Sequence, residues 1–328
     1  MNNRRQFIKT LAGTGLALTL PSFRLFADEQ TDKWGTMMPL KPLGSTGKKV
    51  TILGLGGFHV GRMDLDVAQE TVDMAIESGI RFFDTAESYQ KGGSEETYGK
   101  VLTPKYRDEI FLMTKTRARD EKTAREHLEG SLRRMKTDHL DLWLMHAVNS
   151  KDDVEKRLNN GVVDYMLKAK EEGKIKHIGF SGHTMTEAHL RLLEISDVPE
   201  VCMMPINVLD RGYDSYIDNV LPVLQRKKMG VIAMKTLAGG AFFGRGFDGK
   251  RESTDTVIDH VSVKDAITFA LSIPNDVLVT GPKTPKMLKE KIDIVNSFKK
   301  LSPDEQHALF AKVEHLSGNE VEYYKGIP

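Results

Sequence analysis

Four titratable side chains of different chemical types follow successive apolar runs of the sequence. Asp84 and Tyr89 come at the end of the second run and just after it, Lys115 ends the third run and His146 ends the fourth. A tyrosine hydroxyl is a weak acid with a pKa of about 10, which a nearby Lys115 ammonium would lower while Asp84 holds the lysine charged. His146 can donate a hydrogen bond to a carbonyl oxygen. Together these residue types predict a proton donor for a developing alkoxide.

The rest of the sequence narrows the chemistry further. No serine–histidine pair and no reactive thiol is evident, and the single cysteine, Cys202, is interpreted as a buried hydrophobe. A site that protonates an alkoxide without a nucleophile needs hydride from a cofactor. The alternative is a metal-dependent hydrolase, which would use His59, Asp84, His146 and His183. Because the first apolar run lacks the paired His-x-His that such a centre would use, we expect no metal ligands among the catalytic residues.

Eight β-rich runs recur at intervals of roughly 30 residues, the length of one strand–helix unit. They span Val50–Leu55, Ile80–Asp84, Ile110–Lys115, Leu140–His146, Ile175–Ser181, Val201–Asn207, Gly230–Lys235 and Val277–Gly281. Most are apolar throughout, as expected of strands that are covered on both faces. The segments between them carry helical spacing, as in the sets Ala68/Val72/Ala75/Ile76, Ala124/Leu128/Leu132/Met135 and Val162/Val163/Met166/Leu167.

This alternation predicts an α/β fold, a single (β/α)8 TIM barrel. In such a barrel the reactive groups lie at the carboxyl ends of the strands, where Asp84, Lys115 and His146 stand. A doubly wound sheet is the alternative, but its glycine fingerprint would need a further glycine where His59 stands. With 47 Lys and Arg against 46 Asp and Glu, the chain has no basic excess, so we expect no nucleic-acid partner.

Three segments of the sequence resemble the aldo-keto reductases. They are Phe83-Asp84-Thr85-Ala86-Glu87-Ser88-Tyr89, Met113-Thr114-Lys115 and Asp141-Leu142-Trp143-Leu144-Met145-His146. Later segments look like that family's cofactor-binding strands, and the resemblance covers roughly residues 40–298. It implies that Asp84, Tyr89, Lys115 and His146 form a catalytic tetrad. It also implies an NAD(P)H-dependent reduction of an aldehyde or ketone to an alcohol, with Tyr89 as the general acid and NADPH or NADH as the cofactor.

The resemblance assigns cofactor-binding positions as well. They are Ser181, Met203, Met234, Lys235, Leu237, Gly281, Lys283 and Thr284. Several positions depart from the family's usual residues. Gly182-His183 replaces an asparagine, Met203 a glutamine and Met234 a tyrosine, and His183 could donate to the carboxamide instead. Near the eighth strand, Met287 stands where the family often has an arginine that binds the 2′-phosphate of the adenosine. Lys291 stands where the family has an asparagine on the adenine side. Lys283 and Lys286 lie close by and could supply positive charge to the phosphate instead.

The first 27 residues carry the pattern of a twin-arginine export signal. Arg4-Arg5 is followed by the apolar run Leu11–Leu20, which is too short to span a bilayer, and Ala27 offers a cleavage point. We therefore expect residues 1–27 to be a signal peptide, 28–41 a tether and 42–328 the barrel. This division predicts the twin-arginine (Tat) export machinery as a partner, a periplasmic or otherwise exported protein, and no stable membrane insertion after processing.

One connection, between Lys235 and the helix near Val261, is longer than the others and breaks the regular alternation of strands and helices. It holds the glycine-rich stretch Gly239–Gly249, which we interpret as a lid on the catalytic face. The altered nicotinamide positions leave one more alternative, a cofactor-retaining binding or regulatory protein on a reductase fold. The identity of the carbonyl substrate is not encoded in these loops.

Overall fold

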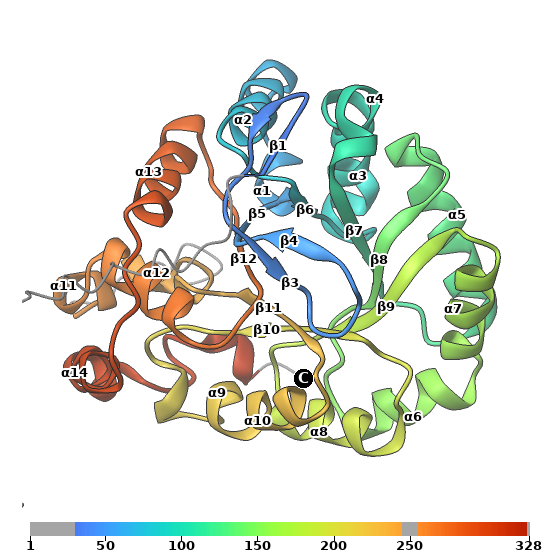
Figure 1. The fold of residues 1–328 in the computed structure, drawn as a ribbon. Coiled ribbons are helices and arrows are strands. Elements are labelled where there is room, and N and C mark those ends of the chain that lie inside the picture. Colours follow the sequence, from blue (N-terminus) through green and yellow to red (C-terminus); the bar gives the residue numbers. More distant parts are fainter. Residues whose placement is uncertain (1–29, 245–254, 327–328) are drawn as a thin grey trace, which may run out of the picture.

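The structure is a computed structural model that describes residues 30–244 and 255–326. Within these ranges eight parallel strands close into a barrel with the neighbour order β10-β11-β12-β5-β6-β7-β8-β9. The strands are β5 (Leu53–Gly56), β6 (Phe82–Asp84), β7 (Phe111–Thr116), β8 (Leu140–Met145), β9 (Ile175–Ser181), β10 (Val201–Pro205), β11 (Gly230–Met234) and β12 (Val277–Thr280). Helices surround the barrel (Figure 1). The predicted (β/α)8 barrel is confirmed.

Helices connect the strands and cover the outside of the barrel. The α-helices are α1 (Gly57–Val60), α2 (Leu65–Glu77), α3 (Gly93–Val101), α4 (Thr103–Tyr106), α5 (Glu121–Met135), α6 (Lys151–Asn159), α7 (Val162–Glu171), α8 (Thr186–Ile195), α9 (Tyr216–Asn219), α10 (Leu221–Arg226), α11 (Val257–His260), α12 (Val263–Ser272), α13 (Pro285–Asn296) and α14 (Pro303–Val313). Short 3-10 helices are η1 (Tyr89–Gly92), η2 (Arg107–Glu109), η3 (Asp210–Gly212), η4 (Ala238–Phe243), η5 (Glu314–Leu316) and η6 (Tyr323–Lys325).

Apolar side chains from the strands fill the barrel interior. This interior cluster comprises Leu43, Val50, Phe82, Met113, Leu142, Leu144, Val201, Met203, Ile232 and Val277. The alternate strand residues point outward and pack under the helices in a second, larger cluster. Because both faces of each strand are buried, most strand residues are apolar, which is the pattern that made the strands recognisable in the sequence.

The helices bury the faces that their spacing predicts, with one exception. On α2 the buried side includes Ala68, Val72, Ala75 and Ile76. Gly79, with a φ of +86°, follows this helix where a Cβ would lie 2.5 Å from the backbone nitrogen of Met38, so only glycine fits. On α7 we expected Leu167 on the buried face, but it is 39% exposed. Met166 and Ala169 set the buried stripe, and Leu167 lies about 100° further around the axis.

Residues 28–41 were expected to be a tether, but the described part of this segment forms strands. β1 (Thr31–Asp32) pairs with β2 (Gly35–Thr36), and β3 (Leu40–Pro42) pairs with β4 (Lys49–Thr51), both antiparallel. The Asp32 carboxylate accepts hydrogen bonds from Nε and Nη2 of Arg81 at 2.6 and 2.8 Å, which fixes the first hairpin. The predicted strand Val50–Leu55 is divided between β4, which pairs with β3, and β5, which belongs to the barrel. The Thr51 hydroxyl donates to the carbonyl of Leu53 at 2.9 Å across the break.

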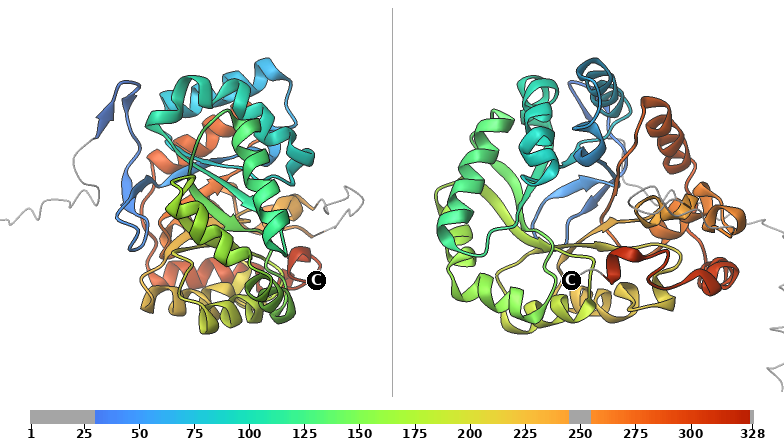
Figure 2. Two further views of the ribbon diagram at one scale, coloured as in Figure 1. Left: turned by 90° about the vertical axis from the view of Figure 1, so that its right-hand side faces the viewer. Right: turned by 180° about the vertical axis from the view of Figure 1, so that it is seen from behind.

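The two hairpins and the C-terminal segment lie at opposite ends of the barrel (Figure 2, left). The hairpin β3–β4 lies across one end, where Leu43 and Val50 join the interior cluster. At the other end, where the strands finish, η6 (Tyr323–Lys325) lies close to the barrel mouth (Figure 2, right). The carboxyl-terminal end of the barrel is thus the end that can hold a site.

Part of the long connection after β11 falls outside the described residues. η4 occupies its start and α11 its end, while residues 245–254, which include the second half of the expected lid Gly239–Gly249, lie outside the described residues. The expected signal peptide, residues 1–27, also lies outside the described residues. None of the helices in the described part combines the length and apolar character that crossing a bilayer requires.

Candidate active site

Lys115 stands at the centre of the predicted site. β6 and β7 are neighbours in the barrel, which brings Lys115, near the end of β7, beside Asp84 at the end of β6. The Lys115 ammonium donates hydrogen bonds to Asp84 Oδ1, to the backbone carbonyl of Thr85 at 2.7 Å and to the Tyr89 hydroxyl oxygen at 3.3 Å. Lys115 is 1% exposed and Asp84 3%, so this is a buried ion pair. Because Lys115 donates to the tyrosine oxygen, the hydroxyl proton of Tyr89 remains free to be given away.

The electrostatics of this group differ in one respect from the sequence expectation. Burial would lower the pKa of Lys115, but the Asp84 carboxylate and Tyr89 more than offset this and raise it, so the ammonium stays charged. Burial raises the pKa of Tyr89 above its usual value, and the opposing effect of Lys115 is too small to reverse this. Lys115 therefore acts on the tyrosine pKa in the expected direction, but burial outweighs it and the net shift is upward. The cause is desolvation, which sequence spacing does not reveal.

His146 lies beside the tyrosine and is neutral. Its ring packs edge-on against Tyr89 with the ring centroids 5.7 Å apart. Burial, followed by the charges of Lys115 and Arg117, holds the pKa of His146 well below its usual value. Its Nδ1 lies 3.3 Å from the Ser88 hydroxyl. A neutral imidazole has one N–H, and a Ser88 hydroxyl that donates to Nδ1 leaves that proton on Nε2.

The positions implied to bind a cofactor gather at the ends of β9 to β12 and the start of α13. Ser181 ends β9, and its hydroxyl donates to the Met145 carbonyl at 3.4 Å. Met203 belongs to the interior cluster, and Met234 packs against that cluster from the end of β11. The remaining positions lie in the turns after β11 and β12: Lys235, Leu237, Gly281, Lys283 and Thr284. The Thr284 hydroxyl accepts from the backbone N–H of Met287 at 3.2 Å as the N-cap of α13.

Two lysines on this side, the buried Lys291 and the partly buried Lys235, form no ion pair with a carboxylate among the described residues. Burial lowers the pKa of Lys235 to about 8, and its ammonium lies 5.3 Å from the centroid of the Tyr324 ring. Burial lowers the pKa of Lys291 to about 8 as well, with nearby Glu290 opposing. Since a buried cation without a counter-charge is costly, these lysines indicate that the site is built to receive an anion.

His59 and Gly281 lie beside these lysines. Burial, together with Lys283 and Lys291, lowers the pKa of His59 to about 4, and its buried Nδ1 has no hydrogen-bond partner among the described atoms. A Cβ on Gly281 would lie 2.5 Å from this Nδ1, so the imidazole packs directly against the backbone of Gly281 and only glycine leaves room for it. The unpaired Nδ1 and the nearby charges of Lys283 and Lys291 are polar groups that could face an anion.

His183 does not have the donor role expected for it. Its Nδ1 lies 3.2 Å from the backbone carbonyl of Tyr324, which can only accept, so Nδ1 carries the proton. Burial and the Lys235 charge lower the pKa of His183 to about 4, which leaves the ring neutral. Its Nε2 is therefore an acceptor, and it could receive a hydrogen bond from a carboxamide but not donate one.

The geometry does not support the hydrolase alternative. The Asp84 carboxylate forms a buried ion pair with Lys115, so it is not free to bind a metal ion. Among the described residues the candidate ligands His59, Asp84, His146 and His183 do not converge as a group that could hold a metal ion. The one group of histidines and carboxylates that does so in the described part of the chain is elsewhere, at Asp255, His260 and His315.

A family model described as the aldo/keto reductase family matches residues 52–289. The chain belongs to this family. An uncharacterized oxidoreductase of Bacillus subtilis (strain 168), YqkF, is 27% identical over 230 residues, covering 66% of this chain and 70% of that protein. An aldo-keto reductase from Bacillus halodurans, solved in its holo form, is similar with a TM-score of 0.71 at 21% identity, covering 87% of this chain and 99% of that one. An aldo-keto reductase from Klebsiella pneumoniae, solved in complex with NADPH, has a TM-score of 0.65 at 24% identity over 83% and 94% of the two chains.

In this aldo/keto reductase, several supporting residues were missed by the sequence analysis. Ser88 contacts the His146 ring, and the only sequence signal for it is its place directly before Tyr89. Arg157, on α6, donates from Nη2 to the His146 carbonyl at 3.0 Å and holds the backbone of that residue. Tyr324 receives the His183 hydrogen bond from a segment 141 residues later in the chain. No spacing in the sequence points to a contact of that range.

Proposed function

We propose that this aldo/keto reductase reduces an aldehyde or ketone to an alcohol, with NADPH or NADH as the reductant. When bound, the nucleotide supplies hydride to the carbonyl carbon. The observation that carries the proposal is the Lys115 ammonium, which is hydrogen-bonded to Asp84 and to the Tyr89 oxygen at once. This arrangement suits a tyrosine that gives up its proton, because the positively charged ammonium lies beside the oxygen of the phenolate that remains and stabilises its negative charge.

The roles of the side chains follow from their contacts. Tyr89 gives its proton to the substrate oxygen as charge develops there, and Lys115 stabilises the resulting phenolate. Asp84 keeps the lysine charged and oriented inside the barrel. The Nε2–H of neutral His146 donates to the carbonyl oxygen and orients it beside the tyrosine. Burial raises the pKa of Tyr89, which opposes proton release, and the Lys115 ammonium acts against this by stabilising the phenolate.

The residues around Lys235 and Lys291 fit an anionic dinucleotide. Lys291 is buried and Lys235 is partly buried, and neither forms an ion pair with a carboxylate among the described residues, while the buried Nδ1 of His59 has no hydrogen-bond partner there. These groups would hold the phosphates, while Ser181 and the acceptor nitrogen of His183 would meet the carboxamide. The NADPH complex of the Klebsiella relative supports the same class of cofactor.

The test of this proposal is product formation. Purified protein is incubated with NADPH or NADH and a panel of aldehydes and ketones, and the alcohol is quantified by chromatography beside the loss of reduced nucleotide. We expect one alcohol for each nucleotide oxidised. If the protein binds the nucleotide but forms alcohol from no member of the panel, the binding or regulatory alternative, motivated by Met203 and Met234, replaces the reductase.

We further propose that the protein is exported after folding, with the nucleotide already bound. The supporting features are Arg4-Arg5, the short apolar run Leu11–Leu20 and Ala27. Outside the cytoplasm no pool of free nucleotide is evident, so slow release is expected of a working enzyme there. Changing Arg4 and Arg5 together to Lys should keep the protein in the cytoplasmic fraction. Unchanged export would contradict the signal, and exported protein that is free of nucleotide would contradict retention.

A further inference from the structure

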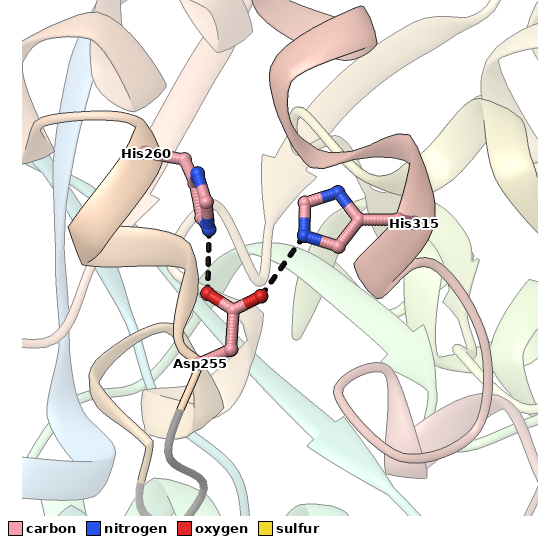
Figure 3. A group of neighbouring side chains, drawn as sticks. All are labelled: Asp255, His260 and His315. Atoms are coloured by element: carbon pink, nitrogen blue, oxygen red, sulfur yellow. Dashed lines mark hydrogen bonds and ion pairs between the residues drawn. The ribbon is translucent and has the colours of Figure 1, made fainter.

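Three polar side chains outside the candidate active site converge on one surface point (Figure 3). Asp255 precedes α11, His260 ends that helix, and His315 lies in η5, which follows α14. The Asp255 carboxylate accepts from Nε2 of His260 at 2.5 Å through Oδ1, and from Nε2 of His315 at 3.0 Å through Oδ2. One ligand atom from each of the three side chains lies within 4.8 Å of the others.

Local structure keeps these three side chains available to one another. The neighbouring carboxylate of Asp259 is used in the N-cap of α11, where it accepts from the nitrogen and the hydroxyl of Thr256 at 3.0 and 2.7 Å. The rings of His260 and His315 stand edge-on, with an interplanar angle of 86° and centroids 5.0 Å apart, so both nitrogens can face the same carboxylate.

The chemistry of the donors selects the kind of ion. Two imidazole nitrogens and one carboxylate oxygen are the ligands of Zn²⁺ and similar first-row transition metals, whereas Ca²⁺ and Mg²⁺ prefer oxygen alone. Bonds of about 2.0–2.1 Å to a tetrahedral ion place its ligand atoms about 3.3 Å apart. The two nitrogen–oxygen separations of 2.5 and 3.0 Å would open slightly, and all three ligand atoms already lie within 4.8 Å of one another. The side chains of Asp255, His260 and His315 are 48%, 32% and 51% exposed, which lets an ion enter and lets water complete its coordination.

We propose that Asp255, His260 and His315 form a binding site for one divalent transition-metal ion, of which Zn²⁺ is the best fit. The ion links the entry to α11 with η5, two segments 60 residues apart in the chain. The segment that follows η5 leads to Tyr324, whose carbonyl receives the His183 hydrogen bond at the barrel mouth. The ion therefore acts as a clasp on the C-terminal segment. It takes no part in the proposed reduction, because none of its ligands contacts Asp84, Tyr89, Lys115 or His146.

The test measures metal binding by the full chain, prepared without a histidine tag and stripped with a chelator. Equilibrium dialysis against Zn²⁺ with elemental analysis should find one equivalent bound at micromolar free metal, and Co²⁺ should give the visible spectrum of a nitrogen- and oxygen-bound ion. Asp255→Asn, His260→Ala and His315→Ala should each weaken binding at least about tenfold. His307→Ala, which removes an exposed histidine from the neighbouring helix α14, is the matched control and should bind as the wild type does.

Thermal unfolding distinguishes a metal site from a cluster whose three side chains are only hydrogen-bonded to one another. Zn²⁺ should raise the melting temperature of the wild type and of His307→Ala, but not that of the three ligand variants. All five proteins should have circular dichroism spectra of the folded barrel in the chelator, because the substituted side chains are exposed. The proposal is overturned if the wild type binds no stoichiometric metal, or if His307→Ala and His315→Ala lose it equally.

Discussion

Replacing Lys115 with Met tests the electrostatic basis of the proposed proton transfer. At 3.3 Å from the Tyr89 oxygen, the ammonium would stabilise a phenolate by about 5 kcal/mol at an effective dielectric constant of 20. The Asp84 carboxylate accepts a hydrogen bond from the same ammonium and cancels much of that field. A hydrogen bond to a charged group, about 1.5–3 kcal/mol, is therefore the better measure, and it corresponds to a fall in kcat of about 10- to 150-fold.

The same substitution also affects stability, which has to be separated from the effect on rate. Lys115→Met leaves the buried Asp84 carboxylate without its partner, which costs about 3–5 kcal/mol of unfolding free energy. The double variant Asp84→Asn, Lys115→Met removes both charges and should recover most of this stability. It should not recover the rate, because the phenolate still lacks its cation.

Steady-state kinetics and denaturant unfolding on the wild type, the single variant and the double variant make the distinction. Nucleotide affinity should change little in either variant, because Lys115 is hydrogen-bonded to Thr85 and Tyr89 and not to the residues proposed to hold the phosphates of the nucleotide. The reasoning is refuted if the double variant is as stable as the wild type and its kcat falls by less than about tenfold.

Further predictions concern the histidines and the nucleotide. Ser88→Ala should lower kcat about two- to tenfold, and histidine nitrogen NMR should show more of the His146 Nδ1–H tautomer; an unchanged tautomer would contradict the role of Ser88. Because Met287 stands where an arginine would grip a 2′-phosphate, the affinities for NADPH and NADH should differ by less than about a hundredfold, or 2.7 kcal/mol, by calorimetric titration; a larger ratio would count against this. Burial lowers the pKa of His189 to about 3, so the unfolded chain binds its proton first and stability falls as pH drops from about 6.5 towards 3. His189→Phe should reduce that slope by up to about 1.4 kcal/mol per pH unit in denaturant titrations, and an unchanged slope would exclude His189 as its source.

The sequence predicts the barrel well because burial on both faces of each strand leaves a continuous apolar run. Once the barrel is predicted, the grouping of Asp84, Lys115 and His146 follows, because the carboxyl ends of its parallel strands all lie at one end of the barrel. The two N-terminal hairpins were not predicted because each of their strands is only two or three residues long. The first hairpin is also held by Arg81, which lies far along the chain.

Other features of the site depend on tertiary contacts that no local pattern carries. The direction of the Tyr89 pKa shift depends on how deeply the phenol is buried. The donor direction of His183 is set by the carbonyl of Tyr324, which lies 141 residues away in the chain. The cluster at Asp255 combines residues 60 positions apart, which a search for metal-ligand spacing along the sequence does not join.

Single-turnover oxidation of bound NADPH by a reactive aldehyde tests the central claim most directly. Stopped-flow absorbance on the wild type and on Tyr89→Phe compares two proteins that differ by one hydroxyl, with nucleotide affinity measured separately in each. We predict rapid oxidation by the wild type, and a rate about 10²- to 10⁴-fold lower in Tyr89→Phe at nearly unchanged nucleotide affinity. Equal rates in the two proteins, or no oxidation by the wild type, would contradict the assignment of Tyr89 as the general acid of a carbonyl reductase.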